Sequence, residues 1–223
     1  MTSFAIKVIA CFSMILDHIK YAIPNINNFA TLYLGRISFP LFAFLVSEGY
    51  KYTSDLKKYY KRLLIFGVIS QIPFMLFRTL VGEWIMLNIM FTLILGLVCI
   101  TIYENEKRRW VSIPTVIFIS ILAEIINVDY GWFGVLSVFI IHVFKNKKIM
   151  LLTTYSGLTV LFYYYLIKME IFSTQGMLYI ISTICSVIFI LMYNGKKGKN
   201  LKRFFYWFYP IHMLLVYILS FIF

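Results

Sequence analysis

Ionisable residues interrupt the apolar stretches of this sequence, and their types could support proton transfer. Asp17 and His18 stand together in the first apolar run, and Arg36 lies in the second. Charged groups inside apolar spans are costly, and by default they mark a functional site or a buried partner. A neutral imidazole can act as a general base, and a guanidinium group can stabilise an oxyanion. We therefore expect chemistry at His18, with a polar clamp between helices as the alternative.

Helical geometry decides which of these groups can meet. Neighbouring residues of a helix point roughly 100° apart, so Asp17 and His18 cannot face each other. Asp17 is instead placed to meet Lys20 or Tyr21 one turn later, and His18 needs a partner on another helix. Further polar residues at similar depth could join the cluster; they are Arg36, Arg78, Asn88, Glu124 and Asp129.

Two prolines indicate local openings of helices beside ionisable residues. Pro40 lies one turn after Arg36, in mid-span, and should free the carbonyl of Arg36 by removing a backbone donor. Such an opening would form an anion or carbonyl site, or else a packing kink in which Arg36 pairs with Asp17. Pro210 could aim His212 into the bundle, although an isolated histidine is more often a satisfied core residue.

The residue patterns of several other chemistries are missing. The three histidines stand in three different runs and lack the i, i+4 spacing of a zinc helix, so no metal is expected. Cys11, Cys99 and Cys185 lie inside apolar runs without disulfide or metal spacing. The sequence also has no glycine-rich phosphate loop and no serine nucleophile elbow.

The elements that must position these residues are apolar helices. The chain has 223 residues, 61% of them hydrophobic and 13% charged, whereas soluble domains carry about 25% charged residues. A membrane-spanning helix needs about 20 mainly apolar residues. Candidate runs are 5–23, 31–50, 62–80, 86–103, 111–127, 131–144, 149–167, 175–193 and 204–223. We therefore expect an all-α, polytopic bundle of about nine transmembrane helices, forming one domain over residues 1–223.

The basic residues sort onto one side of this arrangement. Lys and Arg number 21 against nine Asp and Glu, and seventeen of the 21 fall at the N-terminus or in alternate loops. The basic residues of these loops lie within 51–62, 107–109, 145–148 and 196–203. The positive-inside rule places them and the N-terminus in the cytoplasm of a cell membrane. They would orient the chain and attract anionic lipid headgroups, or hold the phosphates of a cytosolic cofactor.

The sequence resembles the TraX family of integral-membrane acetyltransferases. The matching blocks follow the family order over nearly the whole chain; they are 14–19, 35–50, 61–64, 72–74, 88–96, 129–136 and 209–212. The most specific features are Arg36 with Pro40 and Glu48-Gly49, and the Asp129-Tyr130-Gly131 block. The chain departs from the family pattern at Gln71 and Met75, where acidic residues are expected.

The resemblance implies acetyl transfer from cytosolic acetyl-CoA to an amine or hydroxyl, on a pilin-like peptide or an envelope molecule. It assigns the general base to His18, carbonyl or oxyanion stabilisation to Arg36, and charge balance to Asp17. The residues expected to bind the cofactor are Lys57, Lys58, Arg62, Glu48, Asn88 and Thr92. Those expected to bind the acceptor are Asp129, Tyr130, Arg78 and His212.

Two other functions remain open from the residues themselves. The same polar cluster could serve a small multipass transporter or a non-enzymatic membrane assembly factor. The expected partners are the lipid bilayer, an acyl-CoA donor and a peptide or envelope acceptor, without nucleic acid. Against a transporter, the spans show no clear two-fold repeat with paired breaks.

Overall fold

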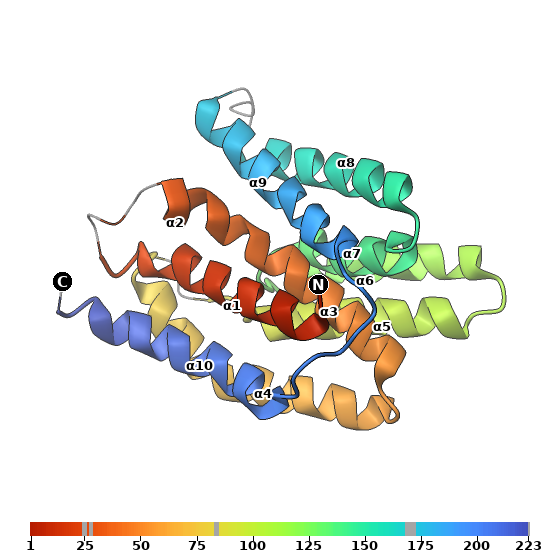
Figure 1. Ribbon diagram of the computed structural model, residues 1–223, viewed down its shortest axis with the longest axis horizontal. Helices are drawn as coiled ribbons and strands as arrows, with labels where there is room; N and C mark the ends of the chain where they lie inside the picture. Colours follow the sequence, from red (N-terminus) through yellow and green to blue (C-terminus); the bar gives the residue numbers. More distant parts are fainter. Residues whose placement is uncertain (24–25, 27–28, 83–84, 168–172, 223) are drawn as a thin grey trace.

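The computed structural model describes residues 1–23, 26, 29–82, 85–167 and 173–222, and these residues fold into helices (Figure 1). The described elements are α1 (Ser3–Ile19), α2 (Phe29–Tyr33), the 3₁₀ turn η2 (Leu34–Ile37), α3 (Ser38–Tyr52), α4 (Leu56–Thr79), α5 (Ile89–Asn105), the 3₁₀ turn η3 (Arg109–Val111), α6 (Ser112–Ile125), α7 (Gly131–Phe144), α8 (Lys148–Ile167), α9 (Thr174–Leu191) and α10 (Lys202–Leu219). Within the described ranges there is no strand, so the expected all-helical fold is confirmed.

Each predicted apolar run corresponds to a helix of at least 14 residues in the structure. The second run contains α2, η2 and α3 in succession, and Phe223 at the end of the ninth run lies outside the described residues. Helices α4 and α5 begin with side-chain caps, since the Asp55 side chain accepts from the Lys58 amide and the Asn88 side chain accepts from the Met90 amide.

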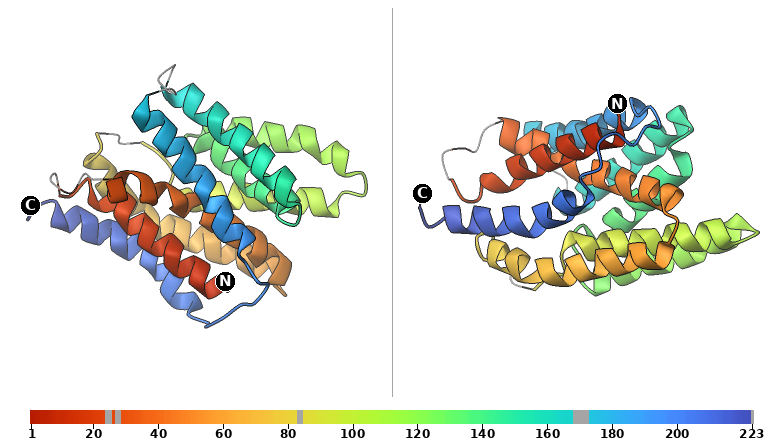
Figure 2. Two further views of the ribbon diagram at one scale, coloured as in Figure 1. Left: turned by 45° about the horizontal axis from the view of Figure 1, so that its top comes forward. Right: turned by 60° about the horizontal axis from the view of Figure 1, so that its bottom comes forward.

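Helices α3 and α7 form the centre of the bundle. Helix α3 packs against α1, α5, α7 and α9, while α7 packs against α3, α5, α6 and α8. Helices α4 and α10 pair on one side, and α8 and α9 pair on the opposite side (Figures 1 and 2). Consequently α1 is covered by α3 and α10, and its ionisable residues face other helices.

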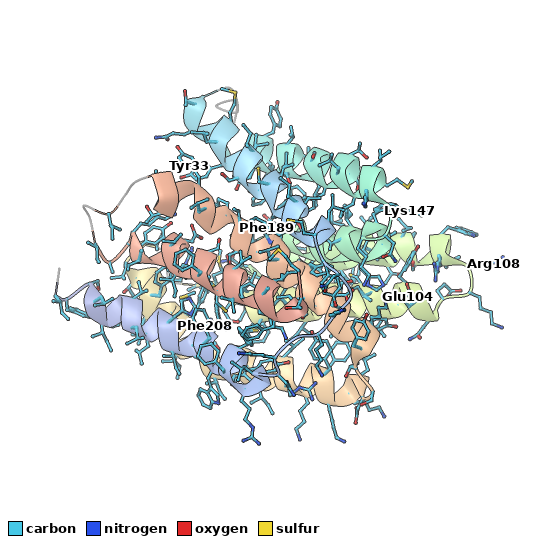
Figure 3. The ribbon with its side chains drawn as sticks, viewed as in Figure 1. Tyr33, Glu104, Arg108, Lys147, Phe189 and Phe208 are labelled. Carbon is cyan, nitrogen blue, oxygen red and sulfur yellow. The ribbon has the colours of Figure 1, made fainter. Side chains whose placement is uncertain are left out.

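The connections rich in basic residues gather at one end of the bundle. There, the amides of Ser3 and Phe4 donate to the carbonyls of Lys196 and Lys197, which ties the first helix to the segment after α9. Figure 3 shows Arg108 and Lys147 at this end and Tyr33 toward the other. We call these the basic end and the chamber end, the second after the cavity described below, and the predicted gathering of the basic loops is confirmed.

The structure supports membrane association but does not confirm nine spans. Only α4 and α9, among the described helices, are long and apolar enough to cross a bilayer. Helices α1 and α7 have 17 and 14 residues, which gives about 25 and 21 Å at 1.5 Å per residue, less than the hydrocarbon core. Helix α4 presents an exposed apolar stripe at Leu64, Val68 and Ile72, of the kind that contacts lipid or a partner.

The irregular backbone predicted beside Arg36 is present, but the predicted position of Pro40 in mid-span is wrong. Pro40 is the third residue of α3, where a missing backbone donor costs nothing because the first turn has no helical acceptor for it. The irregular backbone lies earlier, in η2, which carries Arg36. Pro210, in contrast, lies inside α10 as expected.

Candidate functional site

A cavity of about 430 Å³, which we call the chamber, opens at the chamber end between α1, η2, α4, α8, α9 and the α6–α7 turn. Its charged and imidazole walls come from Asp17, His18, Arg36, Arg78, Glu124 and Asp129, and its aromatic walls include Tyr21, Phe77, Tyr130, Trp132, Phe162, Tyr163, Tyr165 and Tyr179. The predicted outer polar cluster is therefore largely assembled in one cavity. Arg78 joins it from the last turn of α4.

Asp17 is the centre of the charged network. Its Oδ1 lies 2.9 Å from Lys20 Nζ and 3.6 Å from Arg36 Nη2, and the Lys20 side chain is only 7% exposed. The Arg36 guanidinium also lies over the Tyr179 ring, 5.0 Å from its centroid. These contacts confirm the predicted Asp17–Lys20 meeting, and they favour the packing alternative for Arg36 over a free anion site.

Gly35 allows η2 to approach α1 closely enough for this network to form. A Cβ built on Gly35 would lie 2.6 Å from Asp17 Cβ and 2.8 Å from Asp17 Cα. The Ser13 hydroxyl donates to the Leu34 and Gly35 carbonyls and holds the two segments together. The missing side chain at Gly35 therefore positions Arg36 next to Asp17.

His18 finds its partner on α10, as predicted. His18 Nδ1 lies 2.9 Å from His212 Nε2, and His212 Nδ1 lies 2.9 Å from the Phe208 carbonyl oxygen. A carbonyl only accepts, so Nδ1 of His212 carries the proton, and in the neutral ring its Nε2 accepts from His18 Nδ1. This order leaves His18 Nε2 as an acceptor, so the geometry permits it to take a proton.

The turn between α6 and α7 places Asp129 and Tyr130. Asn127 and Tyr130 have positive φ angles of 54° and 64°, and the turn bonds to the backbone of Leu87 on both sides of Val128. The Thr92 hydroxyl donates to the Asp129 carbonyl at 2.5 Å. The turn is thus fixed from two sides, which holds the Asp129 side chain against the chamber.

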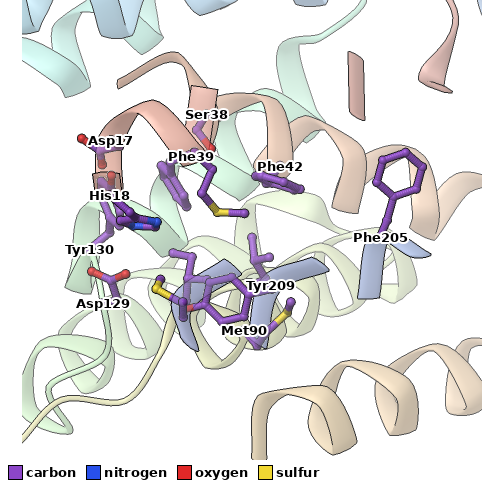
Figure 4. Close-up of a pocket in the computed structure, with 14 residues that line it drawn as sticks. Asp17, His18, Ser38, Phe39, Phe42, Met90, Asp129, Tyr130, Phe205 and Tyr209 are labelled. Atoms are coloured by element: carbon purple, nitrogen blue, oxygen red, sulfur yellow. The ribbon is translucent and has the colours of Figure 1, made fainter. Parts of the chain in front are cut away.

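Figure 4 shows Asp129, His18 and Tyr130 among the residues that line a smaller, mainly apolar cavity of about 60 Å³. Asp17, His18, Asp129 and Tyr130 line both cavities. Burial raises the pKa of the Asp129 carboxyl to about 6, against a lowering effect of Arg78. Asp129 therefore changes its charge close to neutral pH.

The residues expected to bind a cofactor do not form one site. Asn88 and Thr92 are fully buried near the chamber end, where Asn88 Nδ2 donates to the Gly67 carbonyl and to Gln71 Oε1. Their polar groups are therefore occupied by structural hydrogen bonds. The other expected residues, Glu48, Lys57, Lys58 and Arg62, belong to the end of α3 and the start of α4, at the basic end.

Several chamber residues had no binding or catalytic role predicted from the sequence, among them Trp132, Tyr163 and Tyr179, while Glu124 was expected only as a possible member of the polar cluster. Glu124 Oε2 accepts from the Trp132 amide at 3.3 Å, which links α6 to the start of α7. Tyr163 and Tyr179 complete the wall opposite Arg36. Trp132 directly follows the Asp129-Tyr130-Gly131 block, which was a usable signal, whereas nothing marks the two tyrosines among so many aromatic residues.

Comparison with known proteins shows one relative that is similar along nearly its whole length and a family model that matches the chain. Over 244 residues the chain is 27% identical to the probable fimbrial assembly protein FimC, serogroup H1, of Dichelobacter nodosus, covering 96% of this chain and 94% of the relative. No solved structure matches the chain. The relative contradicts the expected acetyl-CoA-dependent acetyltransferase, because its name describes fimbrial assembly and not acyl transfer. A link to the wider membrane acyltransferases likewise has no support.

The family model of the TraX protein matches residues 3–220. This span includes every sequence block that carries the resemblance, from the Asp17-His18 pair to His212. The chain therefore belongs to the TraX protein family.

Proposed function

We propose that this chain is a polytopic membrane protein that assists the assembly of a fimbria or pilus and does so without catalysing a reaction. The observation that carries this proposal is the similarity to a fimbrial assembly protein along nearly the whole length of both chains. Similarity of this extent favours a shared role of the entire helical bundle.

In this proposal all the long helices cross a membrane, with the basic end in the cytoplasm. The positive-inside rule supports that orientation, since the described basic loops lie together at one end. Exposed apolar side chains on α4, α6 and α10 support contact with lipid; examples are Ile72, Phe118 and Ile211. Helices shorter than the bilayer core would be matched by local thinning of the membrane.

The chamber would then face the side on which a fimbria is built. Its aromatic walls can pack against apolar side chains, while Asp129 and the Arg36 guanidinium can pair with charged groups. We therefore assign to the chamber the binding of a segment of the fimbrial subunit during assembly. In this proposal, the segment of the fimbrial subunit is the peptide partner that was expected from the sequence.

The test deletes the gene and counts assembled fimbriae by electron microscopy after complementation. The wild-type gene should restore them, and Tyr165→Ala, which removes an exposed chamber wall, should lower their number while subunit levels stay normal. Tyr164→Ala is the matched control, because Tyr164 is similarly exposed and does not line the chamber. Normal fimbriation of the deletion strain would overturn the proposed function, and equal behaviour of the two variants would overturn the role of the chamber.

A further inference from the structure

A third cavity, of about 300 Å³, lies at the basic end and shares no lining residue with the chamber. We call it the basic cavity. It is formed by α3, the connection from α7 to α8, the end of α9 and the segment after α9. The polar residues that line it are Glu48, Lys51, Tyr52, Lys145, Asn146, Lys148 and Tyr193. Its volume lies at the lower limit of small-molecule sites, about 300 to 1,000 Å³.

A hydrogen-bonded chain fixes one of the three lysines. Lys145 Nζ donates to Glu48 Oε1 and to Ser47 Oγ, both at 2.8 Å, and its side chain is 10% exposed. Ser47 Oγ lies 2.9 Å from His142 Nδ1, and His142 Nε2 lies 3.2 Å from Glu104 Oε1. Lys145 is thus neutralised by Glu48 and held by α3, α5 and α7 together.

The other two lysines give the basic cavity an excess of positive charge. Lys51 and Lys148 are both exposed at its rim, and within the described ranges neither makes an ion pair. Lys148 also begins α8, where the helix dipole adds partial positive charge. Two uncompensated ammonium groups beside one cavity favour a phosphate-type anion.

The buried carboxylate of Glu48 calls for a hydrogen-bond donor on the ligand, which a simple anion does not carry. The residue is 5% exposed, and among the described residues its Oε2 has no hydrogen-bond partner, while the Tyr193 side chain interacts with the same carboxylate. A buried carboxylate oxygen gains stability from a donor. The ligand should therefore carry a hydrogen-bond donor next to its phosphate.

The remaining walls are apolar. Phe44, Ile190 and Leu191 line the cavity below the charged groups, and Phe44 and Ile190 are almost fully buried. We propose that the basic cavity binds the phosphodiester headgroup of a membrane phospholipid. The phosphate lies between Lys51 and Lys148, and a headgroup hydroxyl or ammonium donates to Glu48 Oε2.

The test measures binding of dioctanoyl phosphatidylglycerol, phosphatidylethanolamine and phosphatidylcholine, and of inorganic phosphate, to the purified full chain by titration calorimetry in detergent. The first two lipids carry a headgroup donor and should bind more tightly than phosphatidylcholine, which has none. Inorganic phosphate lacks the lipid portion that would reach the apolar walls, and it should bind most weakly.

The variant Lys51→Gln/Lys148→Gln should weaken binding of the first two lipids about tenfold or more, because each lysine contributes a charge-assisted contact. Lys57→Gln/Lys58→Gln is the control, since it removes two exposed charges that do not line the cavity. Both variants alter exposed side chains, so folding should be preserved, and circular dichroism checks this.

Four results would overturn the proposal. An equal loss in both variants would mean general attraction of the basic end for anions. Phosphate binding as tight as lipid binding would mean a site for a free anion. Indifference to the headgroup donor, or no binding at all, would remove the assigned role of Glu48 or the site itself.

Discussion

Gly35→Ala should destabilise the chain by separating η2 from α1. The new Cβ would start 2.6 Å from Asp17 Cβ and 2.8 Å from Asp17 Cα, whereas carbon atoms pack at about 3.5–4.0 Å. The two segments must therefore move apart by about 1 Å. Since Asp17 Cα is backbone, a change of rotamer cannot relieve the contact, and the 3.6 Å approach of Arg36 to Asp17 should lengthen.

Overpacking of this kind costs about 1–3 kcal/mol. At about 2–4 °C per kcal/mol for a chain of this size, the Tm should fall by about 2–12 °C. The assay is thermal unfolding of the detergent-purified protein, followed by circular dichroism.

Gly157→Ala provides the matched control. Gly157 lies inside α8, and a Cβ there meets nothing within 4 Å, so alanine should stabilise the helix by about 0.5–1 kcal/mol. The two substitutions should therefore shift the Tm in opposite directions. A Tm of Gly35→Ala at or above that of the wild type would refute the close contact between η2 and α1.

Three further outcomes are expected. His18→Phe and His212→Phe should each cost about 1–3 kcal/mol by leaving one imidazole nitrogen unpaired, and additive losses in the double variant would contradict their contact. The pKa of Asp129 in the folded chain, about 6, lies above its ordinary value of 3.8, so the protonated carboxyl contributes to the free energy of unfolding. This contribution is complete below pH 3.8 and is lost as the pH rises through 6, and Asp129→Asn should flatten the dependence in denaturant unfolding between pH 4.5 and 7.5. Asn88→Ala should lower stability by about 1–3 kcal/mol in the same assay, because it removes the cap of α5 and leaves buried partners unsatisfied; an unchanged midpoint would refute that role.

Hydrophobic runs and charge placement were sufficient to predict the helices and the basic end. The membrane-spanning count was not, because the runs could not show where α2 and η2 interrupt the second one, although the short run 131–144 already had the length of α7. The break was placed at Pro40 because proline disrupts helix interiors, but its position within the first turn depends on where the helix starts.

The site was partly predictable for a similar reason. Local spacing predicted the contact of Asp17 with Lys20, and helical geometry, which prevents His18 from facing Asp17, predicted a partner for His18 on another helix. Asn88 is polar and buried, as a ligand-binding residue often is. Only the structure shows that its amide donates hydrogen bonds to the Gly67 carbonyl and to Gln71 Oε1. The function suggested by the resemblance was wrong in its chemistry, since the fimbrial relative supports assembly.

The contact between His18 and His212 can form only late in the synthesis of the chain. The two residues are 194 positions apart, so at about 5–20 residues per second the ribosome needs about 10–40 s between them. Until α10 emerges and docks, α1 lacks the imidazole partner, and the apolar cavity lacks the wall formed by Tyr209 and Met213. Chains that stall before α10 would therefore expose an incomplete cavity to the quality-control proteases of the membrane.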